Sequence, residues 1–132
     1  MLSISAIKGK FKRSGIDFKK TFLFDEYPFS NEKILKQFRI DEKCIIYFIR
    51  DTSYSWYLTN KGLLIPSENK YVELSSLTKI DFLNIKENPT LKTANTELTL
   101  FTINDELKFY VEEKSWHLFY SIFKFIIESN IE

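Results

Sequence analysis

Cys44 and His117 are the residues best suited to nucleophilic chemistry, because a thiol beside an imidazole can act as a nucleophile with its base. Both lie in apolar-rich segments, and no catalytic motif surrounds either of them. Cys44 opens the apolar run CIIYFI, which predicts a buried thiol rather than a reactive one. His117 falls on the polar stripe of a predicted helix, where we expect a solvated imidazole. The sequence therefore predicts no catalytic residue, and we expect the protein not to be an enzyme.

Metal and cofactor sites leave recognisable spacings, and this chain shows none of them. It has one histidine, so a histidine-based metal cluster cannot form, and it lacks GxGxxG, P-loop and zinc-ligand patterns. Its acidic residues are scattered, and the pairs at 105–106 and 112–113 are typical of a turn and a helix start. We therefore expect neither a metal nor a cofactor.

Basic side chains are concentrated at the start of the chain. Six cations against Asp17 alone give residues 1–24 a net charge of +5, and isoleucine and phenylalanine residues are interleaved with them. The segment from Thr21 to Phe24 favours a short strand. One interpretation is an arm that lays its aromatic rings on the body and leaves its cations in water. The alternative is a patch for lipid headgroups or phosphate, formed by Lys8, Lys10, Lys12, Arg13, Lys19 and Lys20.

Composition narrows the class of protein further. A chain of 132 residues with 44% hydrophobic residues suits a single globular domain with a full core. The net charge of +1 provides no global field to attract nucleic acid. No segment reaches the roughly 20 apolar residues of a membrane span, and the N-terminus lacks the apolar core of a secretory signal. Together with the lone cysteine, these features predict a cytoplasmic protein.

The last segment, residues 113–130, is predicted to form one amphipathic helix that closes the fold, with Asn130 as a left-handed cap. We expect its main apolar face to be core. A second apolar flank would bind either a partner or the N-terminal segment, and it consists of Leu118, Ile122 and Phe125. The main face consists of Trp116, Phe119, Tyr120, Phe123, Ile126 and Ile127.

Short strands are predicted ahead of this helix. A short helix capped by Ser30 is expected within 28–39, and residues 60–62 signal a hairpin in which Asn60 or Gly62 adopts a positive φ. Residues 75–77 indicate a brief helical turn, and residues 87–96 a long loop. The pattern of strands followed by a helix predicts an α+β fold. The strand ranges, about seven in number, are 44–50, 54–59, 63–66, 70–74, 79–86, 97–103 and 106–111.

Three segments in this order resemble pleckstrin-homology-like domains, and most closely the bacterial PH-like and GRAM-like modules. They are WYLTNKGLLI at 56–65, YVELSSLTKIDF at 71–82 and ELKFYVEEKSWHLF at 106–119. The resemblance implies a bent antiparallel barrel or sandwich closed by the C-terminal helix, with Trp116 plugging one end. It implies a PH-like domain over 30–132, preceded by the arm of residues 1–29. One departure is the first hairpin, where Arg50 stands beside Asp51 instead of in a basic cluster.

The resemblance favours a non-catalytic interaction module that binds a protein or peptide. A peptide adding to a strand edge would use Tyr71 and Val72, and the helix flank would be a second surface. A homo-oligomer is a further option. One alternative is an adaptor for anionic membrane surfaces that uses the basic arm. Another is a small-molecule-binding barrel, which requires a sizeable polar-lined pocket.

Overall fold

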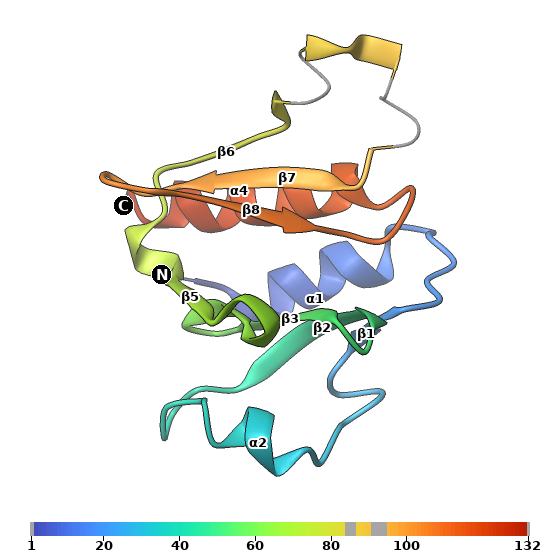
Figure 1. Ribbon diagram of the computed structural model, residues 1–132, viewed down its shortest axis with the longest axis vertical. Helices are drawn as coiled ribbons and strands as arrows, with labels where there is room; N and C mark the ends of the chain where they lie inside the picture. The colour runs from blue at the N-terminus through green and yellow to red at the C-terminus, as the bar shows by residue number, and fades with distance from the viewer. Residues whose placement is uncertain (1, 84–86, 91–94, 132) are drawn as a thin grey trace. The chain divides into compact units, whose positions relative to one another are not determined.

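The computed structural model describes residues 2–83, 87–90 and 95–131, and the chain divides into two compact units (Figure 1). The sheet unit is Phe18–Leu74. The helix unit combines Met1–Asp17 with Ser75–Glu132, so its two segments are far apart in sequence.

The sheet unit contains five antiparallel strands arranged in sequence order. Their run of β-branched and aromatic residues favours pleated structure. The short helix α2 (Glu32–Leu35) and the 3₁₀ turn η1 (Pro66–Glu68) lie in the connections. The strands are β1 (Thr21–Leu23), β2 (Cys44–Asp51), β3 (Tyr54–Thr59), β4 (Gly62–Ile65) and β5 (Lys70–Glu73).

The helix unit contains a three-stranded antiparallel sheet of β6 (Lys79–Asp81), β7 (Glu97–Phe101) and β8 (Glu106–Tyr110). The closing helix α4 (Trp116–Ser129) lies across one face of this sheet (Figure 1). Phe109 and Phe123 join the two layers, with ring centroids 5.3 Å apart. The 3₁₀ turn η2 (Leu74–Ser76) precedes β6.

A helix that the sequence did not predict, α1 (Ile4–Lys12), also belongs to the helix unit and contacts α4. Ser3 caps it by accepting the Ala6 amide at 3.2 Å, and the side chain of Ile7 is fully buried. Lys10 and Lys12 lie in its last turn, where the negative end of the helix dipole stabilises positive charge. Residues 1–29 thus contribute α1 to the helix unit and β1 to the sheet unit. Strand β1 lies where the sequence predicts a short strand.

The predicted α+β class with a C-terminal helix is confirmed. The described residues form eight strands rather than about seven, because the segment at 21–23 pairs with β2. The expected closed barrel is not seen, since these strands make separate sheets of five and three. Strand β6 ends at Asp81, and residues 84–86 of the expected strand lie outside the described residues, as do residues 91–94 of the expected loop.

The β3–β4 hairpin forms as predicted, but the prediction of a positive φ at Asn60 or Gly62 is wrong. Thr59 closes the turn instead, because its hydroxyl accepts the amides of Lys61 and Gly62 at 3.1 and 2.9 Å. A side chain at position 62 would collide with the end of the Tyr71 ring, since a Cβ atom there would lie 2.6 Å from Cε1 of Tyr71. A side chain at this position would displace the Tyr71 ring.

Two predicted helix caps also differ from the structure. Asn31, rather than Ser30, caps α2 by accepting the Lys33 amide at 3.0 Å. Asn130 ends α4 in a right-handed conformation, with φ of −74°, and its side chain donates to the Leu77 carbonyl at 3.3 Å. The C-terminal end of α4 is therefore fastened to the segment before β6, which local sequence patterns do not encode.

Candidate functional site

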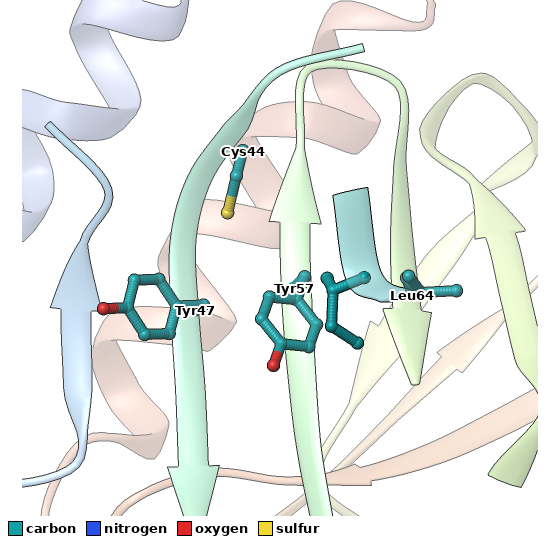
Figure 2. Packing of buried hydrophobic residues seen from close by; sticks show 5 residues of the cluster. Cys44, Tyr47, Tyr57 and Leu64 are labelled. Atoms are coloured by element: carbon teal, nitrogen blue, oxygen red, sulfur yellow. The ribbon is translucent and has the colours of Figure 1, made fainter. Parts of the chain in front are cut away.

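One face of the five-stranded sheet carries a row of large side chains directly opposite one another on successive strands. Figure 2 shows the middle of this row, where Tyr47, Tyr57 and Leu64 lie side by side on β2, β3 and β4. The rings of Tyr47 and Tyr57 stack with centroids 5.9 Å apart, and Phe29 contacts both edge-on. Cross-strand aromatic pairs of this kind stabilise a sheet. The full row is Phe22, Tyr47, Tyr57, Leu64 and Tyr71.

Cys44 packs in one cluster with Tyr47 and Tyr57 and is buried, as the sequence predicts (Figure 2). Burial, with a smaller contribution from the nearby Glu42 charge, raises the pKa of its thiol from about 9.0 to about 12. The thiolate is the reactive form of cysteine, so this thiol is a poor nucleophile at neutral pH. His117 is exposed and stacks on Trp116, with ring centroids 3.6 Å apart. Across residues 2–83, 87–90 and 95–131, no cluster of acidic, histidine or cysteine side chains is placed to hold a metal ion.

Glu42 is a buried carboxylate whose partners all lie within the sheet unit. It accepts hydrogen bonds from the Thr59 hydroxyl, from the Tyr71 hydroxyl at 2.9 Å and from the Arg39 amide at 3.0 Å. The Arg39 guanidinium also pairs with Glu73 on β5. A buried charge with several hydrogen bonds is well satisfied. This group fastens residues 39–42 to the β3–β4 hairpin, so we assign it a structural role.

Tyr71 and Val72, predicted to bind a peptide, lie half-buried on β5 at the edge of the five-stranded sheet. The Leu74 amide donates to the Lys61 carbonyl at 2.9 Å. Because hydrogen-bonded pairs alternate along an antiparallel ladder, Val72 bonds to β4 and the main-chain groups of Tyr71 point outward. The Tyr71 side chain, in contrast, is held by Glu42 and lies 5.4 Å from the Arg39 guanidinium. An added strand would therefore meet the main-chain groups of Tyr71 and not its side chain.

Alkaline pH is expected to destabilise the sheet unit. Burial is the main cause that raises the pKa of Cys44 and of Tyr47, Tyr57 and Tyr71 above their usual values of about 9.0 and 10.0. The folded state therefore holds these protons more tightly, and its stability is full below pH 9.0 and falls as pH rises. Each group lowers the free energy of unfolding by at most about 1.4 kcal/mol per pH unit, and only between its unfolded and its folded pKa.

Urea unfolding followed between neutral and strongly alkaline pH measures this loss. The matched variant Cys44→Ala should move the start of the decline from near 9.0 to near 10.0, because only tyrosines then remain. A urea midpoint that stays constant well above pH 10.0 would contradict the prediction.

The six cations predicted to form a lipid or phosphate patch are divided between the units. Lys8, Lys10, Lys12 and Arg13 lie on α1 and at its C-cap, whereas Lys19 and Lys20 belong to the sheet unit. Lys12 and Arg13 are exposed, but Lys8 and Lys10 are half-buried. The Lys10 ammonium lies 5.5 Å from the centre of the Phe125 ring, and the Lys20 ammonium donates to the Arg50 carbonyl at 3.1 Å. Several of these cations therefore have intramolecular roles.

The helix flank of Leu118, Ile122 and Phe125 is not an open partner surface, contrary to expectation. Ile122 is fully buried, and Leu118 and Phe125 are half-buried. Helix α1 contacts α4, with Lys10 placed over the Phe125 ring. The N-terminal segment thus takes part in covering α4, which is the other outcome that the sequence left open.

The helix unit has a surface hollow at the C-terminal end of α4, which we call the helix-end pocket. Three segments line it: residues 75–78 before β6, residues 102–104 in the β7–β8 turn, and Ile127, Asn130 and Ile131. This open hollow has a volume of about 580 Å³, and the buried side chains of Leu77 and Ile127 contribute to its wall. The β7–β8 turn and the end of α4 lie at the same end of the unit (Figure 1).

The chemistry of the helix-end pocket is neutral and partly apolar. None of its lining residues is charged, and its polar groups are hydroxyls and amides. Ile103 is 87% exposed and Ile131 is 80% exposed. In the described part of the helix unit, these are the two exposed large hydrophobic side chains, and both line this one pocket.

Sequence reasoning missed this pocket because its lining comes from three separated segments. The sequence assigned Ile103 to a strand of 97–103, but β7 ends at Phe101 and Ile103 lies in the turn. The polar neighbours of Ile103, which are Thr102, Asn104 and Asp105, could have indicated a turn at this position, because turns favour polar residues.

Comparison with protein-family models, with curated proteins and with solved structures gave no match for this chain. The helices in the described part of the chain are too short or too polar to cross a membrane.

Proposed function

We propose that this protein is a non-catalytic interaction module of the cytoplasm that binds a protein or peptide through the helix-end pocket. The observation that supports this proposal is the convergence of Ile103 and Ile131, both largely exposed, on one uncharged pocket. Large exposed apolar side chains scattered singly need no explanation, but a group around a hollow is typical of an interaction site. The protonated thiol of Cys44 is consistent with a non-catalytic protein.

A neutral segment with a large aliphatic or aromatic side chain suits this pocket. The apolar wall favours burial of such a side chain, whereas a charged one would lose its hydration without gaining a partner. The Ser75 hydroxyl and the Asn104 side-chain amide line the pocket and can bond the main chain of the same segment.

We also propose a PH-like architecture for the chain. A meander of short antiparallel strands, then a smaller sheet closed by a C-terminal helix, supports this proposal. The burial of Trp116 near the start of α4 is consistent with the role expected for it in such modules. Many different functions occur on one fold, so the functional proposal depends on the pocket alone.

Selection from a displayed library of random peptides tests the function directly. We expect peptides with a large apolar residue to be enriched on the wild-type protein and to bind Ile103→Ser about 10- to 100-fold more weakly. That range corresponds to losing about 1.5–3 kcal/mol of apolar burial. Ile40→Ser is the matched control, because Ile40 is fully exposed and belongs to the sheet unit.

Failure to enrich any peptide, or equal loss of binding in Ile40→Ser, would overturn the proposed function. The membrane alternative is tested separately with vesicles rich in anionic phospholipid at low salt. Cosedimentation that fades with added salt and is lost in Lys12→Glu/Arg13→Glu would favour that alternative, since both side chains are exposed.

A further inference from the structure

We propose that residues 28–38 form a strap that opens as one unit while the strands of the sheet unit stay paired. The strap packs against the face of the five-stranded sheet on which Cys44, Tyr47 and Tyr57 lie (Figure 2). Its opening controls the access of solvent and reagents to that face and to the Cys44 thiol. All of these residues belong to the sheet unit, so the strap is independent of the helix-end pocket and of the function proposed for it.

Both ends of the strap are fastened to the sheet by hydrogen bonds. Just before it, the Tyr47 hydroxyl on β2 donates to the Tyr27 carbonyl at 2.6 Å. Just after it, the Arg39 amide donates to the buried Glu42 carboxylate at 3.0 Å, and this carboxylate also accepts the Tyr71 hydroxyl at 2.9 Å. These two attachments set where the moving segment begins and ends.

Between these attachments, the hydrogen bonds of the strap are all local. The main-chain amides of residues 34–38 donate to carbonyls within the strap, in and just after the short helix α2. Across the described residues, no hydrogen bond or ion pair links residues 28–38 to the sheet. The strap side chains are exposed except for Ile34, which is buried, and Phe29 and Phe38, which are half-buried.

Three apolar side chains therefore hold the strap closed. Phe29 contacts Tyr47 and Tyr57 edge-on, with ring centroids 5.0 and 5.2 Å away. Phe38 contacts Tyr57 at 6.5 Å, and Ile34 packs in the same cluster. The strands beneath are instead joined by continuous main-chain pairing from β1 to β5. Segments with few buried apolar contacts open at a lower free energy than paired core strands, so the strap opens first.

Cys44 is a natural reporter of this motion. It is 8% exposed when the strap is closed, and it is the one cysteine of the chain, so a thiol reagent labels a single site. When opening and closing are fast, the labelling rate is proportional to the fraction of molecules that are open. The same motion uncovers Tyr47, Tyr57 and Leu64, so the open state also presents an apolar surface.

Thiol labelling of the wild-type protein over a urea series tests the proposal. Strap opening exposes little surface, so we expect the labelling rate to depend weakly on urea at low concentrations and steeply only near global unfolding. The fluorescence of Trp56 and Trp116, which are buried in the two units, follows global unfolding. Phe29→Ala should raise the labelling rate in the absence of urea about 10- to 100-fold, because it removes the half-buried ring that contacts both tyrosines.

Phe125→Ala is the matched control, because Phe125 is a half-buried phenylalanine of the helix unit. It should leave the labelling rate in the absence of urea within about twofold of the wild type, since distant sites act independently. A wild-type rate that rises steeply from the first addition of urea, in step with global unfolding, overturns the strap. Equal acceleration by Phe29→Ala and Phe125→Ala overturns it as well. The wild-type series gives an answer even if Phe29→Ala does not fold.

Discussion

Ile122→Glu is expected to unfold the helix unit rather than to disrupt a surface. Ile122 is fully buried on α4, between turns that carry the buried side chains of Phe119 and Ile126. A carboxylate there would lose its hydration and leave a buried charge without a partner. The lost apolar burial adds to this penalty, and together they cost on the order of 5 kcal/mol. That is a large share of the roughly 5–15 kcal/mol that stabilises a typical domain.

Urea unfolding followed by circular dichroism measures the effect of this substitution. Ser121→Glu is the matched control, because it places the same charge one residue away at an exposed position on the same helix. Ile122→Val should lose only about 0.5–1.5 kcal/mol, since it removes one methylene group and keeps the site apolar. If Ile122→Glu were as stable as Ser121→Glu, then Ile122 would have to be exposed in solution, and the helix flank would again be a candidate partner surface.

Trp116→Ala is expected to cost about 3–5 kcal/mol of unfolding free energy. Trp116 is buried at the start of α4, and its ring centroid lies 5.2 Å from that of Phe82, which follows β6. Phe82 also contacts Tyr120 one turn further along the helix, at 5.2 Å. Removing the indole therefore leaves a cavity between the helix and the end of β6, which its neighbours can fill only in part.

Thermal and urea unfolding of this variant should be compared with those of Glu128→Ala, an exposed change on the same helix that is expected to stay within about 0.5 kcal/mol. Trp56 is the second tryptophan of the chain and is fully buried in the sheet unit. Its fluorescence in Trp116→Ala reports whether that unit keeps its own packing when the helix unit is weakened. A transition unchanged from the wild type would mean that Trp116 is not packed against the end of β6.

The strands were predictable because their signal is local. The segment at 54–59 was predicted with the bounds that β3 has, because Trp56 and Leu58 alternate with the more polar residues between them. The strand at 21–24 was predicted from residues that favour strands, although the pairing of β1 with β2 joins residues more than 20 positions apart. Helix α1 was missed because it is only nine residues long and its apolar positions are separated by lysines.

The role of Gly62 shows a different limit. The hairpin was predicted correctly for an incorrect reason, because Asn60 or Gly62 was expected to supply a positive φ. In the structure a side chain at position 62 would meet the ring of Tyr71, which lies on the next strand after the turn. No window of sequence around position 62 contains that information.

The sequence by itself determined the α+β class, the order of the strands, the closing helix and the burial of Cys44, Phe119 and Trp116. These features depend on side-chain periodicity and hydrophobicity, which act over a few residues. The tertiary structure decided that Ile122 is core, that the cations of residues 8–20 are divided between two units, and that Ile103 and Ile131 meet at one pocket. Each of these depends on which distant segments pack together, because exposure is a property of the neighbours that a residue acquires and not of its own type.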